Sequence, residues 1–276
     1  MGKSAEIDYI NCVAEIDNVP LDDFNNYLLH KPFSDPRCGE YLMDIAQVMN
    51  LLPAPPARLL DVGVGSGWTS ELFARRGYEV LGLDISPDMI ELARLRAHPN
   101  LGFQVCDYET GPIPANFDAA VIYDSLHHAE NEFLVIKNIF EALAPGGMLI
   151  TVEPGAGHSR TADSIEVMRK YGTTEKDMPF SLQFELMQRA GFRSVRQYTR
   201  LSQLPLSSVN TSAGSLRQVR DALSLAYGSA SGLTSIALAV KADAVEQPVE
   251  APETIAGALL ALSVVHDQHI HKADIA

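Results

Sequence analysis

The 276-residue chain has only three cysteines, Cys12, Cys38 and Cys106. They lie far apart, are odd in number and form no Cys-x-x-Cys pair, which argues against a disulfide framework and against a thiolate metal site. We therefore expect no metal ion. Such sparse cysteine usage is typical of a reducing compartment, so the sequence predicts a cytoplasmic protein.

Long apolar runs and clustered basic residues are also missing. The closest approach to a membrane span, residues 255–265, is shorter than the roughly 18 apolar residues that a span needs, and residues 1–6 lack the apolar core of a signal peptide. The 21 Lys+Arg residues face 35 Asp+Glu, a net charge of −14. Because this charge repels phosphate backbones and anionic lipid, we expect neither a nucleic-acid nor a membrane partner.

What the sequence does contain is an alternation of strands and helices. Short apolar segments predict strands over 58–62, 79–83, 101–106, 117–123 and 148–152. Helical spacing between them predicts helices over 69–76, 88–97 and 132–143. This alternation favours a parallel sheet with helices on both faces, joined by right-handed crossovers.

Changes in composition divide the chain into three parts. We expect an N-terminal helical cap over 1–56, an α/β ligand-binding domain over 57–241 and a linker with a C-terminal helix over 242–276. In the cap, residues 1–36 are polar and are interpreted as irregular, and a helix is predicted over 40–52. Later elements of the α/β domain are predicted as helices over 161–171 and 182–190, strands over 195–201 and 234–241, and a helical insertion over about 205–230. Ser181 is the expected N-cap of the helix over 182–190.

A glycine turn follows the first predicted strand. Gly63, Gly65 and Gly67 allow a sharp bend from strand to helix against which a ligand can lie. The dinucleotide fingerprint Gly-x-Gly-x-x-Gly fails in both frames, because Trp68 and Ser70 stand where its third glycine belongs. Trp68 is interpreted as a packing residue. A nicotinamide oxidoreductase is therefore an alternative with weaker support.

Three acids follow the same spacing as the strands. Asp61, Asp84 and Asp107 are each 23 positions apart, one strand–helix unit, so they should meet at the carboxyl edge of the sheet. An acid after the second strand suits the hydroxyls of a ribose, and one after the third suits the exocyclic amine of adenine. The pattern predicts a nucleoside site.

Five segments in this order resemble the motifs of class I S-adenosylmethionine-dependent methyltransferases. They are LDVGVGSG (residues 60–67), LDIS (83–86), CD (106–107), FDAAV (117–121) and LAPGG (143–147). The resemblance implies a Rossmann-like, doubly wound, mostly parallel seven-stranded sheet of order 3-2-1-4-5-7-6 whose last strand is antiparallel. It also implies S-adenosylmethionine as cofactor and S-adenosylhomocysteine as product.

The resemblance assigns cofactor contacts by motif. Asp61 and the three glycines would hold the amino-acid end of the cofactor, Asp84 the ribose, Ile85 one adenine face and Asp107 the adenine amine. Further cofactor contacts are expected from Met89, Cys106, Tyr108, Tyr123 and Asp124.

Candidate catalytic residues follow the fourth and fifth predicted strands. His127 or His128 is expected to deprotonate a hydroxyl acceptor near neutral pH, the alternative being that both only pack or cap the next helix. Glu153 and His158 are expected to face the acceptor. The acceptor itself is predicted to be a small molecule, most simply a hydroxyl of glycan or secondary-metabolite type.

Other functions stay open from the sequence. The acceptor atom can be nitrogen or carbon of a small metabolite, and the chain can be a non-catalytic module that binds S-adenosylmethionine or S-adenosylhomocysteine. The apolar stripe within residues 254–266 is expected to dock on the α/β domain or to form a homodimer.

Overall fold

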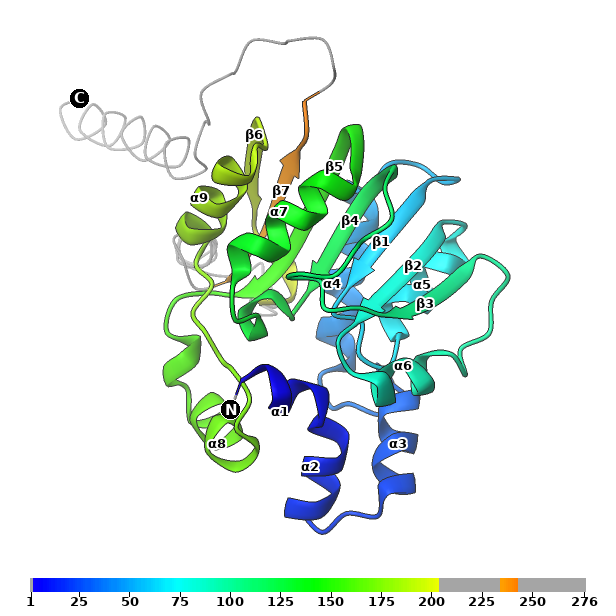
Figure 1. Cartoon of the computed structure of the whole chain (residues 1–276), viewed down its shortest axis with the longest axis vertical. Coiled ribbons are helices and arrows are strands. Elements are labelled where there is room, and N and C mark those ends of the chain that lie inside the picture. The colour runs from blue at the N-terminus through cyan, green and yellow to red at the C-terminus, as the bar shows by residue number, and fades with distance from the viewer. Residues whose placement is uncertain (1, 204–233, 243–276) are drawn as a thin grey trace, which may run out of the picture.

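The computed structural model describes residues 2–203 and 234–242, which contain one seven-stranded sheet of order β3-β2-β1-β4-β5-β7-β6 (Figure 1). Strand β7 is antiparallel to both of its neighbours, and the remaining pairs are parallel. The predicted Rossmann-like fold and strand order are confirmed. The strands are β1 (Arg58–Val62), β2 (Glu79–Asp84), β3 (Leu101–Val105), β4 (Phe117–Tyr123), β5 (Leu143–Pro154), β6 (Ser194–Tyr198) and β7 (Thr234–Val240).

Helices cover both faces of the sheet because successive strand residues point to opposite sides. Leu59 packs with Ile45 and Phe73, which come from α4 (Cys38–Leu51) and α5 (Trp68–Arg76). Leu60 packs in the opposite layer with residues of α7 (Glu132–Ala142) and α9 (Phe180–Ala190), which lie together in front of the sheet in Figure 1. Both layers are apolar and buried, so the sheet is a rigid platform.

The order of the strands creates a crevice at one edge. Strand β1 pairs with β2 on one side and with β4 on the other, so the connections after β1 and β4 leave the sheet in opposite directions. Ligands of open α/β sheets bind where the strand order reverses in this way. The crevice lies at the carboxyl ends of β1, β2 and β4.

Most of residues 3–29 are helical, so the expectation that residues 1–36 are irregular was wrong for this part. They form α1 (Lys3–Ile7), α2 (Tyr9–Ile16) and α3 (Leu21–Leu29), beside α8 (Ala162–Tyr171) and below the sheet in Figure 1. Ile10 and Leu28 bury their side chains with Leu92 of α6 (Pro87–Ala93). These helices are too short to be stable alone and depend on such tertiary contacts, which local periodicity does not reveal.

Several element ends differ from the predictions. Helix α9 begins at Phe180 with Pro179 as its N-cap residue, not Ser181, because the carbonyl of Pro179 already accepts the first helical hydrogen bonds. Helix α6 ends at Ala93 instead of residue 97, and β6 ends at Tyr198 instead of residue 201. The predicted helices within 205–230 and 254–266 lie outside the described residues. No described helix is long and apolar enough to cross a lipid bilayer.

Candidate functional site

A cavity of about 520 Å³ opens at the carboxyl ends of β1, β2 and β4. The sheet side of its wall includes Gly63 and Gly65 from the turn after β1 and Asp84 from the end of β2. The opposite side comes from the N-terminal helices and includes Lys3 and Tyr9. The cavity therefore lies between the sheet and the helical cap, at the place that the topology favours for a ligand.

The backbone of the turn after β1 requires glycine at three positions. Gly63, Gly65 and Gly67 all have positive φ angles, of 73°, 51° and 77°, a region that side chains with a Cβ rarely adopt. A Cβ on Gly63 would collide with the side chain of Ser125, and one on Gly67 would lie 2.6 Å from Phe103 Cζ. Gly63 thus lets the side chain of Ser125 approach the backbone in the cavity wall. Gly67 permits close packing of α5 against β3 and does not line the cavity.

Asp84 is held rigidly in the cavity wall. Its Oδ2 accepts a hydrogen bond of 2.7 Å from the Gly65 N–H, and its Oδ1 accepts one of 2.9 Å from the Ser86 N–H. Burial raises the pKa of this carboxyl above its usual value, although the two backbone donors act in the opposite direction. Each oxygen keeps acceptor capacity for a hydroxyl pair beside it.

Asp107 also lines the cavity, but it is tied to the cap. The Lys3 ammonium donates to Oδ1 at 3.2 Å and to Oδ2 at 3.1 Å, and it pairs with Glu109 at 3.2 Å. Burial raises the pKa of Asp107, but the bonds from Lys3 and Thr110 outweigh this and hold it below its usual value. A lysine 104 positions earlier in the chain carries no sequence signal for this contact.

Asp61 does not line the cavity, although it belongs to the same spacing pattern. It is 1% exposed, and its Oδ2 accepts hydrogen bonds from Thr69 Oγ1 at 2.7 Å and from Ser70 Oγ at 2.6 Å. Burial raises its pKa to about 6, partly opposed by the two hydroxyls. The carboxylate therefore connects β1 to the first turn of α5 instead of facing a ligand.

All residues that were expected at the site divide into two groups, those that line the cavity and those that do not. The expected residues that line the cavity are Gly63, Gly65, Asp84, Ile85, Met89, Asp107, Tyr108, Tyr123, Asp124 and His128. Those outside its lining are Asp61, Gly67, Cys106, His127, Glu153 and His158.

His128 is the histidine of the pair that lines the cavity. It ends the short 3₁₀ helix η1 (Leu126–His128), where Nδ1 donates to the Thr174 carbonyl at 2.6 Å. The carboxylates of Glu6 and Glu175 lie 3.5 and 3.9 Å from the same nitrogen. Burial lowers the pKa of His128, but these carboxylates outweigh burial and raise it to about 9.

His127 is buried beside a carboxylate. Its Nδ1 lies 2.7 Å from Oε2 of Glu153, which is 0% exposed at the end of β5. The other oxygen of Glu153 accepts the N–H groups of Ser125 and Leu126 at 3.1 and 2.8 Å. Glu153 therefore positions the loop after β4 and the His127 ring. The expectation that Glu153 faces the acceptor was wrong, because Glu153 does not line the cavity.

His158 lies next to His127 and contacts Glu175. Its Nε2 is 2.7 Å from Oε2 of Glu175, and its ring centroid is 5.0 Å from that of His127. Glu175 raises the pKa of His158 above its usual value, against the effect of burial. Glu175, which lines the cavity, is thus the residue that joins His158 to the site.

Sequence reasoning missed several cavity residues. Lys3, Glu6 and Tyr9 come from the segment that was expected to be irregular, and Glu175 comes from a loop. Trp68 packs edge-to-face on Tyr123, as its interpretation as a packing residue required, and it also lines the cavity. The amphipathic patterns of residues 9–16 and 21–29 are the sequence signals that could have indicated covering helices.

Comparison with known proteins places this cavity in a wider context. Residues 60–151 match the family model described as a methyltransferase domain. Two similar curated proteins are named ubiquinone biosynthesis O-methyltransferase. The one from Xylella fastidiosa (strain 9a5c) is 37% identical over 105 residues, 36% of this chain and 42% of the relative. The one from Xanthomonas campestris pv. campestris (strain B100) is 35% identical over 102 residues, 34% of this chain and 42% of the relative. The matches span less than half the length of these relatives.

Solved structures share the fold over most of the chain. The S-adenosylmethionine-dependent methyltransferase from Mesorhizobium loti has a TM-score of 0.55 and 19% identity, covering 72% of this chain and 98% of that one. Phosphoethanolamine N-methyltransferase 2 from Haemonchus contortus, in complex with phosphomonomethylethanolamine and S-adenosylhomocysteine, has a TM-score of 0.54 and 20% identity. It covers 74% of this chain and 53% of that one. At such identities the likeness establishes the fold alone.

Proposed function

We propose that this chain, which carries a methyltransferase domain of the class I S-adenosylmethionine-dependent superfamily, transfers the methyl group of S-adenosylmethionine to a hydroxyl oxygen of a small molecule. The observation that carries the proposal is the single cavity that brings the glycine turn, Asp84 and Asp107 together with His128. The names of the two curated relatives support oxygen as the acceptor atom. Dimerisation stays a prediction.

The residues of the cavity fit the cofactor. Asp84 would accept the ribose hydroxyls, Ile85 would cover adenine, and Asp107 would accept from the adenine amine. A Cβ at Gly65 would find only Met89 Sδ, 3.9 Å away, so the wall is open beside this turn. The methionine portion would lie there against the backbone of Gly63. Bound S-adenosylmethionine supplies an activated methyl group on its sulfonium.

The acceptor requires alignment and loss of a proton. We assign His128 as the base that removes this proton, because His128 lines the cavity, whereas His127 is hydrogen-bonded to Glu153. Only the neutral imidazole can take the proton. Because the pKa of His128 is raised to about 9, the rate of methyl transfer should rise with pH up to about 9. A sugar or phenolic hydroxyl, as in glycans or secondary metabolites, would suit a wall that mixes Tyr9 and Tyr41 with polar groups.

Cofactor binding is tested by calorimetry with S-adenosylhomocysteine. The wild-type chain is expected to bind, and Asp84→Asn to bind about 10- to 100-fold more weakly, because hydrogen bonds to a charged group contribute about 1.5–3 kcal/mol. The matched control is Asp163→Asn on the exposed surface of α8. A flat titration with folded wild-type protein would contradict the proposal.

Catalysis is tested by mass spectrometry of a hydroxyl-acceptor panel incubated with S-adenosylmethionine. His128→Ala is expected to lower kcat by about 10²- to 10⁴-fold, the usual contribution of a general base, with S-adenosylhomocysteine affinity retained. Methylation on nitrogen or carbon would instead indicate an N- or C-methyltransferase. Cofactor binding without turnover on any acceptor would indicate a non-catalytic module, and thermal protection by NAD an oxidoreductase.

A further inference from the structure

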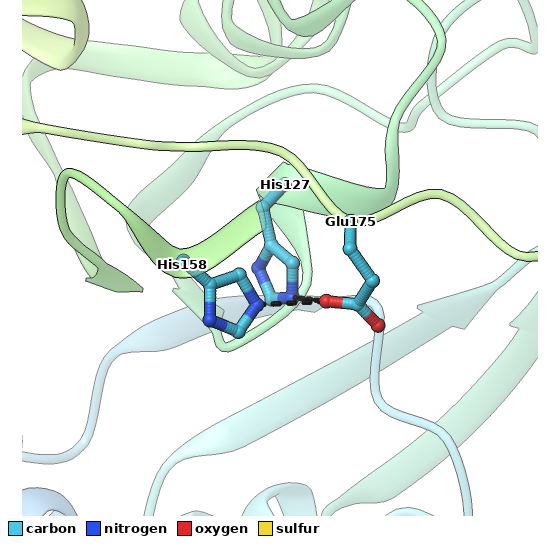
Figure 2. Close-up of side chains that lie close together, drawn as sticks. All are labelled: His127, His158 and Glu175. Carbon is cyan, nitrogen blue, oxygen red and sulfur yellow. Dashed lines mark hydrogen bonds and ion pairs between the residues drawn. The ribbon is translucent and has the colours of Figure 1, made fainter. Parts of the chain in front are cut away.

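Three side chains from separate segments converge in Figure 2, and one of them, Glu175, belongs to the cavity wall. His127 comes from η1, His158 from the 3₁₀ helix η2 (His158–Arg160), and Glu175 from the loop before α9. They offer one ligand atom each, and these atoms lie within 4.8 Å of one another. We propose that they bind a divalent transition-metal ion, with Zn²⁺ as the best match. The sequence predicted no metal, because no local motif joins residues that are 31 and 17 positions apart.

The donor set and its spacing fit Zn²⁺. Two imidazoles and one carboxylate are a known ligand set of catalytic zinc, at bond lengths of about 2.0–2.2 Å. In a tetrahedral site such bonds place neighbouring ligand atoms roughly 3.4 Å apart. His127 Nε2 lies 3.5 Å from Glu175 Oε2, which already matches, whereas the 2.7 Å contact from His158 Nε2 to the same oxygen must open slightly.

One ligand is oriented in advance by a buried carboxylate. Glu153 accepts the Nδ1–H of His127 at 2.7 Å, so the lone pair of the neutral ring lies on Nε2, on the side of Glu175. Metal-binding histidines generally donate their second ring N–H to such a partner, which fixes the tautomer and raises ligand basicity. The side chain of His127 is only 4% exposed. These features distinguish the cluster from histidines that meet on a flexible surface.

The cluster also leaves a coordination position for an outside ligand. It offers three protein ligands, and catalytic zinc sites keep a fourth position open. Glu175 is both a ligand in this scheme and part of the cavity wall beside His128. Through Glu175, the proposed metal site adjoins the space in which the acceptor would bind.

This arrangement defines a role for the ion, and this role rests on the proposed function. A hydroxyl oxygen bound to the ion would have a lowered pKa, and its proton would pass to His128. The oxygen then forms the new C–O bond to the methyl carbon. The electrons of the broken C–S bond stay on sulfur, giving S-adenosylhomocysteine.

The metal site is tested on the whole 276-residue chain, stripped by a chelator and titrated with Co²⁺, whose visible absorption reports coordination. We expect one saturable equivalent with the absorption of a four- or five-coordinate ion, displaced by Zn²⁺. His158→Asn and Glu175→Gln are each expected to weaken Co²⁺ binding at least about tenfold.

Matched histidine variants serve as controls. His30→Asn changes an exposed histidine at the end of α3, and a triple Asn variant changes His266, His269 and His271, which lie outside the described residues. Both are expected to bind Co²⁺ like the wild type. No saturable binding by the wild type, or binding that is lost in the triple variant and kept in His158→Asn, would overturn the proposal.

Glu153 is tested as a positioning residue. Glu153→Gln is expected to weaken Co²⁺ binding about 10- to 100-fold, the usual effect of changing a partner of a metal-binding histidine, and to change the Co²⁺ absorption spectrum. A merely structural role would leave the spectrum of the loaded protein unchanged. Should Glu153→Gln not fold, His158→Asn, on the more exposed side of the cluster, still tests the metal site itself.

Calorimetry with S-adenosylhomocysteine separates the two proposals. Cofactor binding by a chain that binds no metal would overturn only the metal site. Co²⁺ binding by a chain that binds no S-adenosylhomocysteine would overturn only the proposed function. If both bind, a rise in methyl transfer on adding Zn²⁺ to the stripped chain supports the role of the ion, and an unchanged rate would overturn that role.

Discussion

At the scale of single residues, identical side chains in a regular pattern take different roles. Asp61, Asp84 and Asp107 are equally spaced, yet Asp84 faces the cavity, Asp107 is paired with Lys3, and Asp61 accepts from the hydroxyls of α5. Spacing brings all three to one edge of the sheet. The direction of each carboxylate is decided by the donors that surround it.

The buried position of Asp61 predicts a pH effect on stability. Because burial raises its folded-state pKa from 3.8 to about 6, the folded chain holds this proton more tightly than the unfolded chain does. The resulting stabilisation is complete below pH 3.8 and is lost as the pH rises through 6. A shift of about two pKa units corresponds to about 3 kcal/mol.

Asp61→Asn should remove this dependence. The free energy of unfolding is measured by urea denaturation from pH 4 to 7. The difference between the variant and the wild type should shift by about 3 kcal/mol in favour of the variant as the pH rises. Asp163→Asn, on the exposed surface, serves as control. If the free energies of unfolding of Asp61→Asn and the wild type changed with pH in parallel, the pKa of Asp61 would not be raised in the folded chain.

At the scale of elements, a buried ion pair joins α4 to the segment that follows β6. The Arg200 guanidinium donates to Asp44 Oδ2 at 2.6 and 3.0 Å, and the side chains are 3% and 0% exposed. Tyr123 donates its hydroxyl to the same oxygen at 2.8 Å and also lines the cavity. This network therefore connects the packing of α4 to the wall of the site.

Breaking this pair should be costly. Asp44→Ala leaves the charge of Arg200 buried without a partner, so we expect a loss of about 3–5 kcal/mol in the free energy of unfolding, measured by urea denaturation. Adding Arg200→Met should recover much of the loss, since it removes the unpaired charge. In the exposed Lys137–Glu141 pair, Glu141→Ala should cost less than about 1 kcal/mol. An equally small loss for Asp44→Ala would contradict the expectation.

At the scale of the whole molecule, the cavity exists because the cap closes over the sheet. Ser86 Oγ donates to the Ile7 carbonyl at 2.8 Å, Ser66 Oγ donates to the Leu28 carbonyl at 2.6 Å, and the Thr174 N–H donates to Glu6. These bonds anchor the cap to the loops at the carboxyl ends of β1 and β2 and to the loop after α8. The sheet alone would offer an open edge.

The sheet and its ligand edge could be predicted because their signals are local. Apolar segments at regular spacing, with glycines at 63, 65 and 67, specify strand, turn and helix in each unit. The order of the strands was implied only by the resemblance to class I methyltransferases. The same regularity placed Asp84 and Asp107 at the cavity, and the resemblance placed Ile85 there. Residues at and just after the end of β4 were also expected at the site, and Tyr123, Asp124 and His128 do line it.

The tertiary structure alone decided how the cap covers the sheet and which distant side chains pair. Lys3 lies 104 positions from Asp107, Glu153 lies 26 from His127, and Glu175 lies 17 from His158. Periodicity describes which face of an element is apolar, but it carries no information on which distant polar groups meet. Such pairs form only when packing has brought their elements together, and the balance of burial and hydrogen bonding there sets the charge and direction of each side chain.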